Sequence, residues 1–268
     1  MPLNRDSPGY IVGFSAVVCL ACAVPIATAA VMLRPKQALN QRVDRLSKVL
    51  GVAGLLKPGE ALPASAIEAR FEENVVAVAV DLRTGARVGP EVVDAKTFDQ
   101  RRAAKDVATS IASPKHSARV LRVPHHAVIY EVMKDGQVEA LILPIQGYGL
   151  WSTMYGYLAL EQDGRTIAGI TFYEHGETPG LGGEIENPAW QAKWKGRQAF
   201  GDDGEVKVRV VKGAAGPAEA DPFRVDGLSG ATITSRGVSH TLDFWLGPHG
   251  FGPFLTQYRA ARAATGGP

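Results

Sequence analysis

Hydroxyl side chains that could hold a phosphate gather near the C-terminus, where residues 229–235 read Ser-Gly-Ala-Thr-Ile-Thr-Ser. Apolar residues then recur every three to five positions up to Leu246, which predicts a helix that begins near Ile233. Gly230 allows a sharp turn, and Ala231 leaves space beside it. A hydroxyl at a helix start faces free backbone N–H groups and the positive end of the helix dipole. This segment can therefore stabilise a phosphate.

The same hydroxyls have a simpler interpretation. Serine and threonine are the preferred residues at a helix N-cap, so the segment could do no more than begin a helix. The two interpretations are compatible, because Thr234 or Ser235 could cap the helix while Thr232 remains available for chemistry.

A glycine-rich turn is the second stretch of interest. Residues 174–184 read Glu-His-Gly-Glu-Thr-Pro-Gly-Leu-Gly-Gly-Glu and follow a predicted strand. A backbone rich in glycine lets a planar ring lie close to main-chain atoms, and Leu181 could cover a face of such a ring. A plain turn is the alternative. His175 with Glu174 and Glu177 does not predict a metal site, because ligands this close on one loop rarely surround a metal.

An aromatic stretch precedes this turn. Residues 147–156 read Gly-Tyr-Gly-Leu-Trp-Ser-Thr-Met-Tyr-Gly, which superficially resembles a dinucleotide-binding fingerprint. The glycine spacing differs from that fingerprint, and no βαβ pattern follows it. We expect its aromatic residues, Trp151 among them, to line an apolar pocket or to pack in the core.

A membrane segment is predicted near the N-terminus. Residues 10–33 carry no charge, and a helix of that length spans about 36 Å, enough for a hydrocarbon layer of about 30 Å. A cleaved signal peptide is the alternative, because residues 27–29 resemble a cleavage site. Cys19 and Cys22 are the only cysteines and lie inside this segment. Two thiols are too few for a closed metal site, so we interpret them as small apolar residues.

The rest of the chain predicts an α+β domain, with helices packed on an antiparallel or mixed sheet. Asp-Gly pairs at 135–136 and 163–164 separate runs typical of strands and predict two hairpins. Further strands are expected at 75–82 and 205–212, helices at 37–50, 64–73, 95–107 and from 187, a loop at 110–117, and breaks after 247 and at 252–253. The net charge of +2 gives no electrostatic reason to expect nucleic-acid binding.

Three stretches, taken in order, carry a resemblance to known proteins: 149–152, 172–185 and the Asp-Gly-Leu-Ser-Gly-Ala-Thr of 226–232. The last resembles the flavinylation motif of the FMN-binding domain family. Together with the N-terminal segment and the Phe-Trp-Leu-Gly of 244–247, they are similar to the NqrC family of the sodium-translocating NADH:quinone oxidoreductases. The related flavin-bearing component of the Rnf-type electron transport complexes shares fewer of these stretches and remains an alternative.

The resemblance implies FMN bound covalently through a phosphoester to Thr232. It implies no catalytic residue and no metal ligand in this chain. The remaining cofactor-binding residues that it suggests are Trp151, Glu177, Thr178, Gly180, Leu181, Gly182, Ser229, Gly230, Ala231, Ile233 and Thr234. The implied domain plan is a tail at 1–9, a transmembrane helix at 10–33, a connector at 34–120, an FMN-binding domain at 121–262 and a tail at 263–268. Residues 52–120 carry no recognised motif.

The implied function is an electron relay within the quinone reductase, for which the isolated chain would not suffice. Its implied partners are the other membrane subunits, membrane lipid and a flavin transferase that installs FMN. The family places the domain on the periplasmic side of the bacterial inner membrane. Basic residues after residue 33 predict the opposite orientation, although large domains often cross regardless of flanking charge. An unmodified anchored binding domain is the further alternative.

Overall fold

The computed structural model describes residues 7–57 and 59–264. The tails predicted at 1–9 and 263–268 therefore lie largely outside the described residues. The chain divides into two compact units, of which the first ends at Arg45 and the second begins at Leu46.

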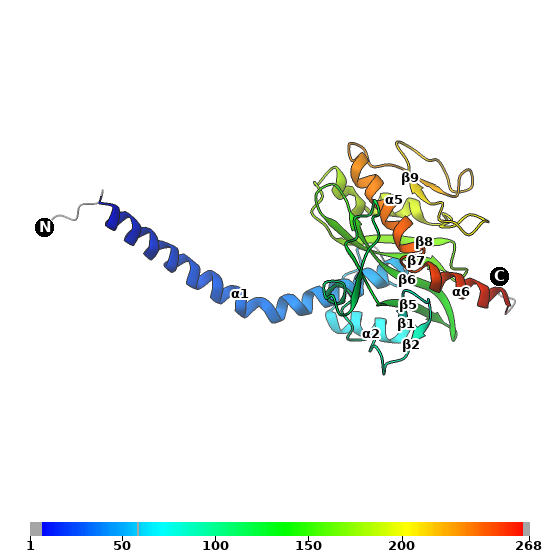
Figure 1. Ribbon diagram of the computed structural model, residues 1–268, viewed down its shortest axis with the longest axis horizontal. Helices are drawn as coiled ribbons and strands as arrows, with labels where there is room; N and C mark the ends of the chain where they lie inside the picture. The colour runs from blue at the N-terminus through cyan, green and yellow to red at the C-terminus, as the bar shows by residue number, and fades with distance from the viewer. Residues whose placement is uncertain (1–6, 58, 265–268) are drawn as a thin grey trace. The chain divides into compact units, whose positions relative to one another are not determined.

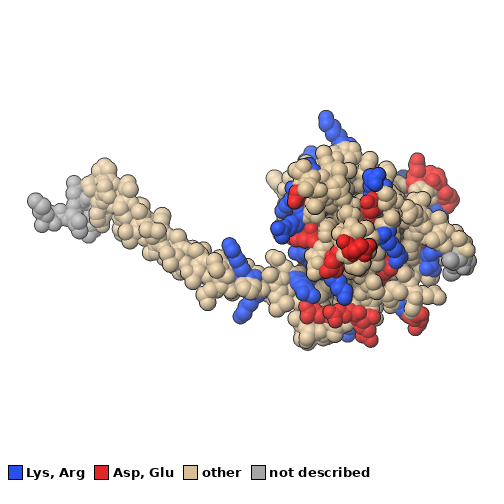
Figure 2. Space-filling model, turned by 60° about the horizontal axis from the view of Figure 1, so that its bottom comes forward, with Lys and Arg blue, Asp and Glu red and all other residues tan. Residues whose placement is uncertain are grey.

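A long apolar helix dominates the first unit. Helix α1 runs from Pro8 to Val52 (Figure 1) and is long and apolar enough to cross a membrane. Its surface before residue 34 shows neither basic nor acidic side chains (Figure 2). The helix expected at 37–50 is confirmed as part of α1, which continues through Pro25 and Pro35. Cys19 and Cys22 are exposed on α1 as free thiols.

The second unit is built on a six-stranded sheet with the strand order β2-β1-β5-β6-β7-β8 (Figure 1). Every neighbouring pair in this sheet is antiparallel. Both predicted hairpins are confirmed, as β5–β6 and β7–β8, and the expected strand at 75–82 is β1. The strands are β1 (Val75–Asp81), β2 (Arg87–Val88), β5 (His126–Lys134), β6 (Gln137–Tyr148), β7 (Thr153–Glu161) and β8 (Ile167–Glu174).

Helices pack on the sheet, which confirms the α+β prediction, and they lie on both of its faces. The expected helices at 64–73, from 187 and near 233 are confirmed. Figure 1 shows α5, in orange, across the sheet from α2, in cyan. The helical elements are α2 (Ala64–Asn74), α3 (Gln100–Ala103), η1 (Gly182–Glu186), α4 (Pro188–Gln191), η2 (Ala192–Trp194), α5 (Thr232–Leu246) and α6 (Gly252–Ala264).

The alternation of the strands divides their side chains between two apolar layers. On one face, Ile129, Leu143 and Leu158 share a buried cluster with Val238 and Leu242 of α5. This layer fixes α5 against the sheet and so positions the hydroxyl-rich segment at the start of the helix.

The opposite face carries aromatic residues and the end of α1. The ring of Tyr130 lies 5.8 Å from Phe71 of α2 and 6.0 Å from Tyr157, centroid to centroid. A Cβ added at Gly169 would lie 3.2 Å from Cγ2 of Val52, so the last turn of α1 packs closely on β8.

Two predictions for residues 95–117 are wrong. Only α3 is helical where a helix was expected at 95–107. Short turns replace the rest because aspartates accept from nearby backbone N–H groups: Asp94 from Lys96, and Asp106 from Ala108. Asp99 instead caps α3, where it accepts from the N–H of Arg102. The expected loop at 110–117 begins instead with β3 (Ser110–Ala112), which pairs with β4 (Arg122–Pro124).

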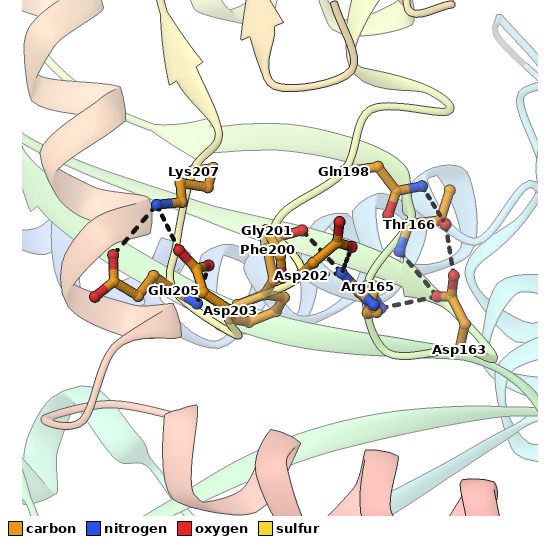
Figure 3. Close-up of polar contacts among 10 residues, drawn as sticks. All are labelled: Asp163, Arg165, Thr166, Gln198, Phe200, Gly201, Asp202, Asp203, Glu205 and Lys207. Carbon is orange, nitrogen blue, oxygen red and sulfur yellow. Dashed lines mark hydrogen bonds and ion pairs between the residues drawn. The ribbon is translucent and has the colours of Figure 1, made fainter.

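The strand expected at 205–212 is also largely wrong. Only β9 (Arg209–Val210) forms there, and it pairs in parallel with β10 (Arg224–Val225). Side-chain contacts shape the preceding residues (Figure 3): Lys207 binds Asp203 and Glu205. The guanidinium of Arg165 donates to the carbonyls of residues 200 and 201.

The break expected at 252–253 is wrong as well, because Gly252 and Pro253 begin α6. Proline suits the first turn of a helix, where its missing N–H group has no partner to lose. The expected break after Gly247 is confirmed, since this residue ends α5 as its C-cap.

Candidate functional site

The start of α5 presents one exposed threonine and one buried threonine. The helix begins at Thr232, and its N-cap is Ala231, which offers no side-chain cap. The N–H groups of the first turn thus lack the acceptor that a serine or threonine cap would supply. Thr232 and Ile233 are exposed, whereas Thr234 is 1% exposed.

The prediction that Thr234 or Ser235 caps the helix is wrong. Both residues lie inside the first turn and are buried. The hydroxyl of Ser235 accepts from the N–H of Leu228 at 3.1 Å, which ties the loop before the helix to the helix itself. The hydroxyls of 234 and 235 therefore hold the local structure, and that of Thr232 remains exposed.

A single buried carboxylate joins three segments of the site. Oε1 of Glu177 accepts from the backbone N–H groups of Leu150, Trp151 and Ser152 at 3.1, 2.9 and 3.2 Å. Oε2 accepts from the hydroxyl of Thr234 at 2.5 Å. Glu177 thus connects the aromatic stretch, the glycine-rich turn and the start of α5.

These donors keep Glu177 ionised. Burial opposes the charge, but the hydrogen bonds from Thr234 and from the N–H groups of Trp151, Leu150 and Ser152 outweigh it and lower the pKa of Glu177. A fixed negative charge therefore lies beneath the surface beside the first turn of α5.

Glycines allow the close packing around this carboxylate. A Cβ at Gly149 would lie 2.6 Å from Oε1 of Glu177, and a Cβ at Gly182 would lie 2.6 Å from Oγ1 of Thr234. On α5, a Cβ at Gly237 would meet the carbonyl oxygen of residue 148 at 2.5 Å. The segments approach as closely as they do because these positions lack side chains.

The turn after Glu177 is tight and exposed. The carbonyl of Thr178 accepts from the N–H groups of Leu181 and Gly183 at 3.1 and 2.9 Å. Gly180 has a φ of +76° and lies on the surface, as does Thr178. This geometry matches the predicted glycine-rich turn and brings Leu181 next to the motif at 229–232.

Large apolar side chains surround the start of α5 without being buried. The exposed fractions are 41% for Leu150, 64% for Trp151, 44% for Leu181 and 53% for Ile233. Packing of Trp151 in the core, one of the two predicted outcomes, is therefore wrong. Exposed apolar groups gathered in one place are typical of a surface that binds a ligand or a partner.

The loop before α5 completes the site. Ser229 and Gly230 are exposed and Ala231 is buried. Gly230 has a φ of +70°, a conformation that favours glycine, and a Cβ there would lie 2.8 Å from Cδ2 of Leu181. The glycine-rich turn and the hydroxyl-rich loop are thus in contact.

Sequence reasoning missed several contributors. Gly149, Gly237 and Ser152 were not among the predicted site residues, although a glycine inside an apolar helix was a signal for close packing. Asp226 belongs to the motif, but its carboxylate accepts from Lys193 at 2.6 Å and from the N–H of Ala215 at 2.7 Å. It anchors the preceding loop.

The arrangement fits a phosphate joined to a planar apolar group. An exposed hydroxyl lies at a helix start without a side-chain cap, which suits a phosphate. The exposed apolar side chains and the glycine-rich turn beside it offer contacts to a flat ring. His175 lies 3.0 Å from Glu186, and among residues 7–57 and 59–264 no group of His, Cys, Asp or Glu could hold a metal.

Comparison with known proteins points to the same segments. The FMN-binding domain family matches residues 149–247. This range begins within the aromatic stretch, contains the glycine-rich turn and the hydroxyl-rich segment, and ends at the C-cap of α5.

Full-length relatives are also similar. The chain is 43% identical to the NqrC protein of the Na(+)-translocating NADH-quinone reductase of Pseudomonas aeruginosa, over 97% of this chain and 99% of that protein. It is 46% identical to the corresponding protein of Vibrio vulnificus, over 95% of each chain. The structure is also similar to the crystal structure of NqrC from Shewanella oneidensis, with a TM-score of 0.74 and 37% sequence identity. The matched region covers 82% of this chain and 99% of the Shewanella chain.

Proposed function

Because the chain belongs to the NqrC family of Na(+)-translocating NADH-quinone reductases, we propose that it carries FMN and relays electrons within such a reductase. The match to the FMN-binding domain and the likeness to the NqrC proteins support the cofactor and the complex. The isolated chain would then be neither the site of NADH oxidation nor that of quinone reduction.

Thr232 is the attachment point in this proposal. The observation that carries it is the contrast between two threonines on one turn: Thr232 is exposed, and Thr234 is buried and donates to Glu177. The exposed hydroxyl can reach a flavin transferase, whereas the buried one could react only after the Glu177 network opened. Ser229 is also exposed but lies before the helix.

The attachment is a phosphoryl transfer. The bond from Oγ1 of Thr232 to phosphorus forms as the pyrophosphate bond of a flavin dinucleotide breaks, the nucleoside monophosphate leaves and the hydroxyl proton is released. The resulting diester keeps one negative charge. The N-terminal N–H groups of α5 stabilise this charge.

The protein positions FMN, and FMN supplies the redox chemistry. Bound FMN can exchange one or two electrons, which suits a relay between different carriers. Leu181 and Trp151 offer apolar contacts to a ring, and the turn at 178–183 allows close approach. Their exposure keeps the site open to another protein of the complex. A covalent link retains the cofactor at high effective concentration in so open a site.

The membrane anchor is α1. Its length and apolar surface support a single-pass attachment, with lipid and the other proteins of the complex as neighbours. We place the domain on the periplasmic side of the inner membrane by analogy with the family, against the orientation that the flanking basic residues predict.

The test is the intact mass of the denatured chain, produced with and without a flavin transferase. We expect the mass increment of FMN, and flavin fluorescence of the denatured band, only with the transferase. The Thr232→Val variant should lose both, while Thr234→Ser should keep them. An unmodified wild-type chain would contradict the proposal and leave an anchored binding domain.

A further inference from the structure

The helix that begins at Thr232 carries an arginine one turn later. Thr232 and Arg236 are four residues apart on α5, and both are exposed. Residues with this spacing lie on the same side of a helix, with Cβ atoms roughly 6 Å apart, and an anion preceding a cation is the favourable order.

Arg236 is available for such a contact. No hydrogen bond or ion pair joins its guanidinium to another described residue. Arg119, another arginine near this end of the sheet, lies over the ring of Tyr148 at 5.3 Å. Lys193 is bound to Asp226. Within residues 7–57 and 59–264, Arg236 is thus a free cation beside the proposed attachment point.

The charges around the first turn make a cation useful. Glu177 is ionised and bonded to Thr234, two residues after Thr232. The phosphodiester would add a second negative charge to the same turn, and like charges oppose each other. His240 does not compensate, because burial and the nearby His116 lower its pKa.

We propose that Arg236 is a positioning residue that pairs with the phosphodiester on Thr232 and holds the flavin linkage against α5. The guanidinium presents two N–H groups to two phosphate oxygens, a geometry that suits arginine better than lysine. This inference rests on the proposed function, since it requires FMN at Thr232.

The test compares Arg236→Gln, Arg236→Lys and a control, Arg83→Gln, in the full chain with and without FMN. Arg83 is also exposed but follows β1. Flavinylation should raise the thermal midpoint of the chain, and this increase should be about 1–3 °C smaller in Arg236→Gln than in wild type. The loss should be smaller in Arg236→Lys, absent in Arg83→Gln and largely abolished in about 1 M salt. The unmodified chain should be unaffected by Arg236→Gln.

Two results would overturn the inference. One is an equal loss in modified and unmodified chains, which would show a purely structural role for Arg236. The other is an increase in thermal midpoint on flavinylation that is the same in Arg236→Gln as in wild type, although the denatured variant carries FMN. If the wild-type chain instead carries no FMN at all, the proposed function itself fails, which distinguishes the two failures.

Discussion

Two glutamates of this domain are almost equally buried, but their pKa values are shifted in opposite directions. Glu177 is 5% exposed and Glu131 is 4% exposed. Hydrogen bonds from Thr234 and three backbone N–H groups overcome burial and lower the pKa of Glu177. At Glu131, burial outweighs the pairing with Arg87 and raises the pKa.

The difference lies in the partners. Glu131 is on β5 and pairs with Arg87, whose side chain is 53% exposed. Glu177 meets donors fixed in the backbone of one loop and in the first turn of α5. Glu131 belongs to the sheet, whereas Glu177 joins the segments that form the candidate site. The charge at Glu177 is thus a product of the site's own geometry.

Removal of the carboxylate should have the largest effect. Glu177→Ala leaves the buried hydroxyl of Thr234 and three partly buried backbone N–H groups without their acceptor, so we expect a loss of about 3–5 kcal/mol of unfolding free energy. Glu131→Ala should lose only about 1 kcal/mol, because Arg87 can turn to water. Urea unfolding in detergent, followed by tryptophan fluorescence, measures both. Equal losses would refute the contrast.

Added volume beside the carboxylate should have the next largest effect. In Gly182→Ala the new methyl group would lie 2.6 Å from Oγ1 of Thr234 and 2.8 Å from Oε2 of Glu177. We expect a loss of about 1–3 kcal/mol. The matched control is Gly183→Ala, whose methyl group meets nothing closer than 3.1 Å. The same unfolding assay should show a smaller loss there.

Substitutions at the two threonines in the first turn of α5 should have smaller effects, which differ between the two positions. In the unmodified chain, Thr234→Val removes the donor to Glu177 and should lose about 1–2 kcal/mol. Thr232→Val changes an exposed side chain and should stay within about 0.5 kcal/mol of wild type. A large loss in unmodified Thr232→Val would show that this hydroxyl already serves the fold.

A change of pH should distinguish the two glutamates with the smallest effect on stability. The lowered pKa of Glu177 stabilises the fold above the ordinary glutamate value of 4.5, and this contribution is lost as the pH falls through its folded pKa. The raised pKa of Glu131 acts in reverse, since its protonation stabilises the fold as the pH falls. The stability advantage of wild type over Glu177→Gln should therefore shrink from about pH 6 to about pH 3.

The stability of wild type relative to Glu131→Gln should instead increase as the pH falls over the same range. Thermal midpoints recorded at each pH give both differences. Parallel slopes for the two variants would contradict the opposite pKa shifts.

The sequence predicted those parts of the fold that depend on local patterns. Alternating residues around Asp135-Gly136 and Asp163-Gly164 predicted both hairpins, because turn type and pleat are local properties. The alternation at 205–212 was equally clear but formed only β9, since contacts of Arg165 and Lys207 shape the residues before it.

The site was predicted as separate motifs, without the network that joins them. Glu177 accepts from residues 25–27 positions before it and from Thr234, 57 positions after it. Backbone donors leave no signature in side-chain identity. The prediction of a capping role for Thr234 failed for the same reason: capping preference is local, and this hydroxyl binds a distant carboxylate.

The most direct test of the account maps the flavin to one oxygen. Trypsin cuts after Arg224 and Arg236 and releases the peptide 225–236, which contains every hydroxyl of the motif. Fragment-ion mass spectrometry of this peptide from flavinylated protein should place the FMN increment on Thr232. An increment on Ser229 or Thr234, or an unmodified peptide, would contradict the assignment of the exposed threonine at the start of α5.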